Sequence, residues 1–278
     1  MQDEKKVIER YGEFAEHVLN DKGALAFNQD GLAPRVKLEA GKLAERVYSE
    51  DELGSIQQDA VDASIACGNP LDGVKLQPGE TVLDLGCGGG MDCFLAASEV
   101  GSAGRVIGID ATPGMIELAN RNKANTDIRN VEFHIGNIED LPVNTGSVDV
   151  IISNCVIDIS SNKKAVFAEA YRVLKPGGRM SISDTVICGK LPEPLKSNVD
   201  EWAGALITPL ETLECYLEFI TGAGFENIQV NALTSYGLEA FEELDEASRT
   251  LLTRGMGGWT ALPENTGLYS ARISATRS

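Results

Sequence analysis

Apolar and polar positions follow two different periods along the chain. The change of period separates an N-terminal helical part from a later part in which strands and helices alternate. Near the N-terminus, apolar side chains recur at the i, i+3, i+4, i+7 spacing of an amphipathic helix, with charged residues between them. This pattern predicts a helix over 3–22. Two shorter helices are predicted over 37–46 and 51–60, and the second follows Ser49 with Glu52 three residues on, which is a capping box.

Beyond residue 80, short apolar runs alternate with helical stretches. Such alternation indicates βαβ units and a parallel sheet, and nearly continuous apolar runs are typical of a sheet covered on both faces. The predicted strands are 81–85, 105–110, 131–135, 148–153, 179–184, 227–230 and 269–275, and the predicted helices are 91–100, 113–123, 162–174 and 213–223. The predicted fold class is therefore α/β, with a doubly wound, mostly parallel sheet of seven strands.

Three segments follow from this pattern. We expect an N-terminal helical cap over 1–70, a cofactor-binding domain over 71–230, and a C-terminal segment over 231–278 that completes the sheet and the substrate pocket. Within the last segment, 238–252 is predicted to be an amphipathic helix and 254–259 a loop. Trp202 and Trp259 are interpreted as core residues, with shielding of a pocket as the alternative.

Composition and charge narrow the class of partner. Of 278 residues, 43% are hydrophobic and 24% charged, as in ordinary globular proteins, but the formal net charge is −18. This charge argues against a general nucleic-acid binder and against docking on anionic membranes, so we expect a small-molecule substrate. No apolar run resembles a signal peptide or a membrane span, and the six cysteines form no CxxC pair. A reduced, cytoplasmic protein is the simplest prediction.

The first predicted strand runs into a glycine-rich turn, Asp84-Leu85-Gly86-Cys87-Gly88-Gly89-Gly90. A turn of this kind binds ligands at the edge of an open α/β sheet, although alone it is often no more than a tight connection. The spacing differs from the dinucleotide motif G-x-G-x-x-G, because position 91 is Met. Asp84 is poorly placed for a pyrophosphate and well placed for a cation. S-adenosylmethionine carries an ammonium and a sulfonium and has no phosphate, and it fits this pattern.

Two further strand ends carry acidic residues in the same register. Asp110 ends the second predicted strand, where a carboxylate accepts hydrogen bonds from ribose hydroxyls, and Ile138 and Glu139 follow the third, where they suit an adenine. Taken singly, Asp110 and Glu139 are equally well read as solvated strand ends. The predicted cofactor-binding set is Asp84, Gly86, Cys87, Gly88, Gly90, Asp110, Ala111, Asn137, Ile138, Glu139 and Asn154.

These residues resemble the class I S-adenosylmethionine-dependent methyltransferases over roughly 76–230. The run Arg172-Val-Leu-Lys-Pro-Gly-Gly178, a turn between a helix and a strand, adds to the resemblance. The resemblance implies that Asp84 and the glycines at 86, 88 and 90 face the methionine part of the cofactor. It also implies that Asp110 binds the ribose and that Ile138 and Glu139 flank the adenine.

Two cysteines stand where a methyl acceptor is expected. Cys155 follows the fourth predicted strand, whose carboxyl end borders the same crevice, and Cys67 lies in a turn before the first strand. Thiolates suit soft, thiophilic ligands, whereas the alternative is that a free cysteine is a small buried hydrophobe. The second interpretation is preferred for Cys87, Cys93 and Cys188. The two histidines, His17 and His134, sit in no motif and are expected to have packing or surface roles.

Several segments are similar to the arsenite methyltransferase family. They are Tyr11-Gly12 in the opening helix, Ala66-Cys-Gly-Asn-Pro70, Ser153-Asn-Cys-Val-Ile157 and Ile182-Ser-Asp184. The resemblance implies that Cys67 and Cys155 bind trivalent arsenic, whose lone pair attacks the methyl group. It implies a nearby positioning role for Asn154. A small thiol reductant is the further expected partner.

The chain departs from that family at three places, one of which is that the paired cysteines often found soon after the Tyr-Gly opening are missing. The family usually has a further binding cysteine where this chain reads 201–207 without one, and Asp158 stands where Asn is expected. Whether Cys188 or Cys215 replaces the missing ligand is left open. The alternative function is methylation of another small acceptor, such as a thiol, another metalloid, or a carbon or nitrogen nucleophile. A protein that senses the cofactor or a metalloid without turnover is the third hypothesis.

Overall fold

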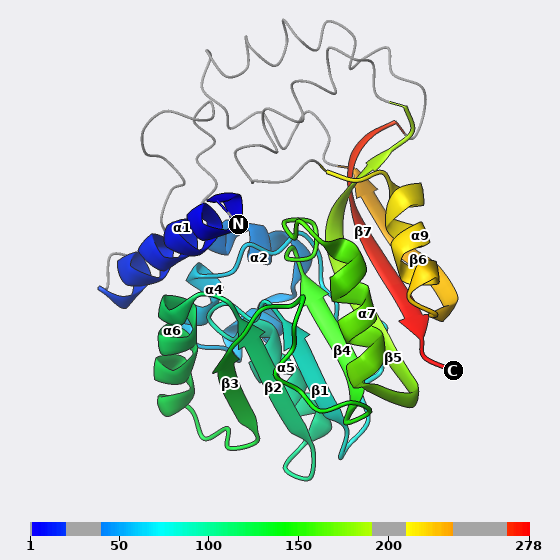
Figure 1. Cartoon of the computed structure of the whole chain (residues 1–278). Helices are drawn as coiled ribbons and strands as arrows, with labels where there is room; N and C mark the ends of the chain where they lie inside the picture. The colour runs from blue at the N-terminus through cyan, green and yellow to red at the C-terminus, as the bar shows by residue number, and fades with distance from the viewer. Residues whose placement is uncertain (1, 21–39, 191–209, 236–265) are drawn as a thin grey trace, which may run out of the picture.

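The computed structural model describes residues 2–20, 40–190, 210–235 and 266–278 (Figure 1). Its centre is a seven-stranded sheet in the order β3-β2-β1-β4-β5-β7-β6. The strands are β1 Thr81–Leu85, β2 Arg105–Asp110, β3 Val131–Ile135, β4 Val148–Asn154, β5 Leu174–Cys188, β6 Glu226–Ser235 and β7 Gly267–Thr276. Pairing is parallel from β3 to β5, and β7 is antiparallel to both β5 and β6. The strand order reverses between β1 and β4, which places a ligand crevice at their carboxyl ends.

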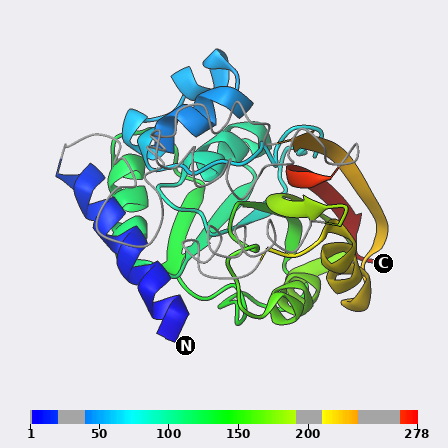
Figure 2. The same ribbon diagram turned by 90° about the horizontal axis from the view of Figure 1, so that it is seen from above.

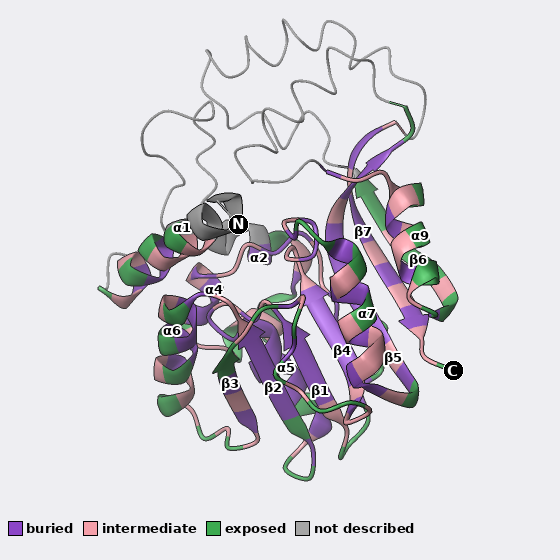
Figure 3. Cartoon of the chain, in the orientation of Figure 1, coloured by how far each residue is buried: buried purple, intermediate pink, exposed green. Residues whose placement is uncertain are grey.

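Helices cover both faces of this sheet. They are α1 Gln2–Leu19, α2 Ala40–Val47, α3 Glu50–Gly54, α4 Gln58–Asp62, α5 Met91–Val100, α6 Pro113–Ala124, α7 Lys163–Val173 and α9 Leu213–Gly222. Successive residues of β1 point to opposite faces, so Val82 packs in a cluster with α5 and α6, and Leu83 packs in a cluster with α7 and α9. Burial is accordingly almost continuous along β1, β2 and β4 (Figure 3).

The N-terminal helix α1 is held at the side of the sheet opposite to β6 and β7 (Figure 2). Phe14, Ala15 and Val18 are buried and pack against Met115 and Leu118 of α6. The apolar stripe predicted from the sequence is therefore the face that α1 presents to the domain. This contact places the start of α1 beside the crevice.

The predicted α/β class with a seven-stranded, mostly parallel sheet is confirmed. One helix was predicted wrongly, because 51–60 forms two short helices, α3 and α4. The capping box at Ser49 does form, with Ser49 N–H donating to Glu52 at 2.7 Å. Gly54, a poor helix former, then ends α3. The division into three segments remains a prediction.

The C-terminal strands are longer than predicted. β5 begins at Leu174 rather than at Arg179, because the chain pairs with β4 on both sides of a register shift. The Pro-Gly-Gly turn is fixed from the other side by Arg277, whose backbone bonds Gly177 and Gly178 at 2.8 Å each. The predicted helix over 238–252, the loop over 254–259, Trp202, Trp259 and the segment 201–207 lie outside the described residues. In the described ranges no helix has the length and apolarity to cross a membrane.

Candidate functional site

A cavity of about 470 Å³ opens at the carboxyl ends of β1, β2 and β4. This volume is in the range of small-molecule and cofactor sites. Every predicted cofactor residue except Gly90 lines it, namely Asp84, Gly86, Cys87, Gly88, Asp110, Ala111, Asn137, Ile138, Glu139 and Asn154. Ile8 and Tyr11 of α1 add an apolar wall that sequence patterns did not assign to the site.

The glycine turn between β1 and α5 needs glycine for two different reasons. Gly86 has φ +72°, and a Cβ atom there would lie 2.2 Å from Val156 Cγ2. Gly90 caps α5 with φ +92°, and its Cβ would lie 2.8 Å from the Phe133 ring. Gly88 has φ +50°, but a Cβ there would meet nothing within 4 Å. Gly90 therefore serves packing behind the cavity, whereas Gly88 leaves room on the cavity side.

Asp110 is held by backbone amides on both sides. Its Oδ2 accepts the Gly88 N–H at 3.0 Å and its Oδ1 accepts the Thr112 N–H at 2.8 Å. Burial raises the pKa of Asp110 and these hydrogen bonds oppose the rise. The carboxylate thus connects the glycine turn to the start of α6 and leaves lone pairs for a ligand in the cavity.

Two buried carboxyl groups, those of Asp84 and Asp92, face the cavity beside the glycine turn. Asp84 is 2% exposed and Asp92 is 7% exposed, and both line the cavity. Burial raises the pKa of Asp92 to about 6, and burial together with the charge of Asp92 raises the pKa of Asp84. Among the described residues neither carboxylate forms a salt bridge with a lysine or arginine. The pair therefore favours a ligand that brings its own positive charge.

The far end of the cavity is suited to a planar, partly apolar group. Ile138 is buried in the core cluster of the α7 face, and its neighbour Glu139 accepts a hydrogen bond from the Ser160 hydroxyl. Asn137 is exposed, and it also lines the cavity. An apolar side chain next to hydrogen-bonding groups provides both a packing surface and an edge for a heterocyclic base.

Asn154, at the end of β4, joins the cavity to the segment that carries Cys67. Its Oδ1 accepts the backbone N–H groups of Cys67 at 3.2 Å and Gly68 at 3.4 Å. Its Nδ2 donates to Gly68 O at 2.7 Å, to Tyr48 Oη at 2.9 Å and to Asp92 Oδ2 at 3.3 Å. The Tyr48 hydroxyl in turn donates to Asp92 at 2.6 Å. One amide side chain therefore ties the turn before β1 to a carboxylate of the cavity.

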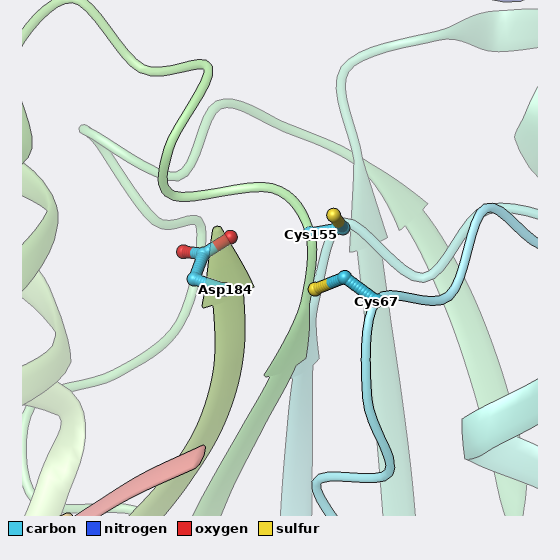
Figure 4. A group of neighbouring side chains, drawn as sticks. All are labelled: Cys67, Cys155 and Asp184. Carbon is cyan, nitrogen blue, oxygen red and sulfur yellow. The ribbon is translucent and has the colours of Figure 1, made fainter. Parts of the chain in front are cut away.

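Cys67 and Cys155 come from segments far apart in the chain and meet next to Asp184 of β5 (Figure 4). The two Sγ atoms and one carboxylate oxygen all lie within 4.8 Å of one another. Ser183 O, on β5, accepts from Cys67 Sγ at 3.3 Å and from the Cys155 N–H at 2.9 Å. Both cysteines are therefore held beside this strand. Cys155 lines the cavity and has the left-handed backbone angle φ +56°.

The Cys155 thiol is in a setting that keeps it protonated. The hydrogen bond with the Cys67 thiol and burial raise the pKa of Cys155 well above its usual value. Burial, followed by the nearby charge of Asp158, raises the pKa of Asp184. A thiol pair of this kind is unsuited to attack carbon as a free thiolate and suited to exchange with a thiophilic centre whose leaving group takes the proton.

The other cysteines and the two histidines do not join this group. Cys87 lines the cavity in the glycine turn, where burial raises its pKa to about 11, and Cys93 donates to Asp84 Oδ2 at 3.2 Å. Cys188 is buried at the end of β5 and Cys215 lies on α9. His17 is on α1, and His134 is exposed on β3 beside Glu132.

Besides Ile8 and Tyr11, sequence reasoning missed three residues of the site, namely Tyr48, Asp92 and Asp184. Asp92 carries a signal that was available, because an acidic residue two positions after a glycine turn sits in the first turn of the helix that follows. Asp184 was noted within the segment Ile182–Asp184 but was given no role. Tyr48 offers no signal, since its contact with Asp92 joins residues 44 positions apart.

Comparisons with known proteins agree with this geometry. Residues 76–236 match a family model described as a methyltransferase domain. The chain is 45% identical over 183 residues to an arsenite methyltransferase of Halobacterium salinarum, covering 66% of this chain and 46% of that protein. It is 35% identical over 190 residues to an arsenite methyltransferase of Aquipseudomonas alcaligenes, covering 66% of this chain and 54% of that protein. The chain thus spans about half the length of the curated relatives it matches.

A solved structure extends the likeness over more of the chain. It is that of an arsenic(III) S-adenosylmethionine methyltransferase from Chlamydomonas reinhardtii, with a TM-score of 0.58 and 27% sequence identity. The match covers 85% of this chain and 72% of that chain. A phosphoethanolamine N-methyltransferase of Haemonchus contortus, in complex with S-adenosylmethionine, has the same fold with a TM-score of 0.58 and 20% identity.

Proposed function

The chain belongs to the methyltransferase-domain family, and we propose that it transfers the methyl group of S-adenosylmethionine to trivalent arsenic bound by Cys67 and Cys155. The proposal has two parts, a cofactor site and an acceptor site. They meet at Cys155 and Asn154, which line the cofactor cavity and also contact the Cys67 segment.

The cavity fits S-adenosylmethionine on the chemistry of its lining. The paired carboxyl groups of Asp84 and Asp92 suit the cofactor's ammonium, and the open side of Gly88 admits its methionine part. We assign Asp110 to the ribose hydroxyls and Ile138 with Glu139 to the adenine, since all three line the cavity. The cofactor supplies a methyl group that its sulfonium has already activated, so the chain's own residues have mainly to orient the acceptor and exclude water.

Arsenic capture by the two thiols needs no general base. Arsenite carries three hydroxyl groups, and each As–S bond forms as one hydroxyl leaves with the proton of the thiol as water. Two thiols therefore release two waters, and the reactants are the protonated Cys155 and the Cys67 thiol that donates to Ser183 O. Asn154 holds the Cys67 backbone, so it is a positioning residue in this scheme and not a ligand.

The observation that carries the proposal is the meeting of Cys67 Sγ with the Sγ of Cys155, which lines the cofactor cavity. The test is turnover with methyl-labelled S-adenosylmethionine, arsenite or methylarsenite, and a small thiol, with products resolved by chromatography and arsenic detection. Methylated arsenic supports the proposal. Binding of S-adenosylhomocysteine with no arsenic product from either substrate contradicts it and favours another small acceptor. The small thiol reductant and the cytoplasmic location remain predictions from the sequence.

A further inference from the structure

Two thiols alone leave trivalent arsenic with one position to fill when arsenite is the substrate. Arsenite has three exchangeable hydroxyl groups, whereas methylarsenite has two. The described part of the chain contains one group of three donors close enough for a single centre, and its third member is the carboxylate of Asp184. Trivalent arsenic is pyramidal, so three donors bound at about 2.3 Å, as in metal–thiolate sites, lie roughly 3.5 Å apart. From separations of at most 4.8 Å, the donors therefore have to approach one another by about 1 Å on binding.

The surroundings of Asp184 leave part of its carboxyl group unused. Its Oδ2 accepts the Asp158 N–H at 3.1 Å and the Tyr216 hydroxyl. The residue is only 1% exposed, so its Oδ1 is buried, and this oxygen has no hydrogen-bond partner. A buried carboxylate oxygen without a donor is costly unless a ligand satisfies it. In Figure 4 one oxygen of the carboxyl group lies on the side of the two sulfur atoms, and the other is turned away from them.

We infer that Asp184 is the third donor of the acceptor site, so that Cys67, Cys155 and Asp184 together bind arsenite through two sulfurs and one oxygen. This inference rests on the proposed function. The capture then balances as arsenite plus two thiols and one carboxyl group giving two As–S bonds, one As–O bond and three waters. Methylarsenite fills both of its positions with the thiols and releases two waters, so it makes no bond to Asp184.

A merely structural role of Asp184 would affect the affinities for arsenite and for methylarsenite equally. A direct bond would affect the affinity for arsenite alone, so comparing the two arsenicals tests the inference. Binding of arsenite and of methylarsenite is measured by titration calorimetry on the full chain and on the Asp184→Asn variant. We expect the variant to lose at least about tenfold in arsenite affinity, while its methylarsenite affinity changes less than about twofold. The control is Asp149→Asn, which makes the same change in a carboxyl group that pairs with Lys175 near the start of β4, outside the three-donor set, and both affinities should stay within about twofold.

Equal losses for both arsenicals in Asp184→Asn, or no loss for either, overturn the inference. These results leave the proposed function standing, since that function fails separately if Cys67→Ser and Cys155→Ser bind both arsenicals as the unmodified chain does. S-adenosylhomocysteine binding and thermal unfolding verify that each variant is folded.

A second variant keeps the inference testable if Asp184→Asn does not fold. X-ray absorption at the arsenic edge should find two sulfurs and one oxygen around arsenite bound to the unmodified chain, and three sulfurs in Asp184→Cys. Two sulfurs and one oxygen in both proteins contradict the assignment of the third donor to this position.

Discussion

At the scale of single residues, Cys155 combines a half-buried thiol with a strained backbone. Its φ of +56° is in the left-handed region, where a side chain with a Cβ atom costs roughly 1–2 kcal/mol. Such strain is typical of positions where the surrounding structure fixes a functional side chain. Here the Cys155 N–H bond to Ser183 O holds the turn that points the thiol toward Cys67.

Replacing this thiol should separate arsenic chemistry from cofactor binding. Cys155→Ser keeps the size of the side chain but removes the soft donor, so we expect turnover to fall by about two orders of magnitude, the scale of a misplaced reactant. Affinity for S-adenosylhomocysteine should change little. The matched control is Cys215→Ser on α9, outside the three-donor group, which should retain full activity. Near-normal turnover by Cys155→Ser would rule out the two-thiol mechanism.

Asp110 should act on the cofactor alone. Asp110→Ala removes a carboxylate that accepts two backbone N–H groups and faces the cavity. Hydrogen bonds to charged groups contribute about 1.5–3 kcal/mol, so the dissociation constant for S-adenosylhomocysteine should rise roughly 10- to 100-fold. Asp127→Ala, at a fully exposed carboxylate, is the control. Unchanged calorimetric affinity in Asp110→Ala would refute the assigned ribose site.

From the sequence, residue positions could be predicted where a side chain lies near a strand end, and the roles of these residues stay predictions. Asp84, Asp110 and Asn154 lie at or next to the ends of strands whose register the apolar runs already fix, and all three line the cavity. Asp92 and Asp184 were not assigned to the site from the sequence, because their importance comes from burial beside other groups. Burial of a single carboxyl group is decided by packing between distant segments, which no local pattern records.

At the scale of elements, the glycine turn offers a matched pair of substitutions. Gly86 and Gly88 both have positive φ, so alanine strains the backbone at each, but only the Cβ at position 86 would collide with Val156. We expect Gly88→Ala to cost about 1 kcal/mol of unfolding free energy from strain. Gly86→Ala should cost a further 1–3 kcal/mol or so from overpacking. Denaturant unfolding measures both variants.

If the collision with Val156 causes part of the loss in Gly86→Ala, shortening the Val156 side chain should restore part of the stability. In a double variant Gly86→Ala with Val156→Ala, the clashing methyl groups of Val156 are gone, and part of the lost stability should return. Strictly additive losses would show that Val156 does not limit position 86.

A second element-level feature is the clamp between α7 and the loop that precedes β4. Arg172 donates to both carboxylate oxygens of Glu169 at 2.7 Å and also to the carbonyls of Leu141 and Val143. The Arg172 hydrogen bonds lower the pKa of Glu169 against the opposing effect of burial. A depressed carboxyl pKa gives stability that is present above the usual glutamate range and lost as pH falls through the folded-state pKa.

Glu169→Gln should therefore destabilise the fold at pH 7 by about 1–3 kcal/mol, and the deficit should shrink as pH falls below about 4. Chemical unfolding at pH 7, 5 and 3.5 measures it. The control is Glu132→Gln, whose ion pair with Arg105 is largely exposed and should contribute less than about 1 kcal/mol. A deficit that is independent of pH would mean that the charge of Glu169 is not what stabilises the clamp.

Elements were predicted well where hydrophobic period and length agree. β1, β2 and β3 form at the predicted residues because a short apolar run fixes both type and bounds. The helix predicted over 51–60 splits because a single glycine within a short amphipathic run outweighs the pattern. β5 and β7 extend beyond their apolar cores because antiparallel pairing between them, from Arg179 with Thr276 to Cys188 with Gly267, adds backbone hydrogen bonds that hydropathy does not reveal.

At the scale of the whole molecule, the sheet order brings four distant parts of the chain to one edge. The turn after β1, the ends of β4 and β5, and the segment around Cys67 meet there, and Tyr48 connects the helical segment before them. The sequence predicted the sheet and therefore the crevice. It did not predict that Cys67 would reach Asp184, because residues 63–80 contain no strand or helix that fixes their path.

Because Asn154 links the Cys67 segment to Asp92, the two binding sites should be energetically coupled. A cofactor ammonium that fixes Asp92 also fixes Asn154, and through it the backbone of Cys67 and Gly68, so arsenite should bind more tightly. Couplings between sites are typically 1–3 kcal/mol, and we expect S-adenosylhomocysteine to raise arsenite affinity roughly tenfold. Asn154→Ala should bring this factor close to one. Asn69→Ala is the control, because Asn69 orders the same segment through Glu52 and Leu71 without contacting Asp92. Calorimetric titration of arsenite with and without S-adenosylhomocysteine gives the factor for each variant, and a tenfold factor surviving in Asn154→Ala would place the coupling elsewhere in the fold.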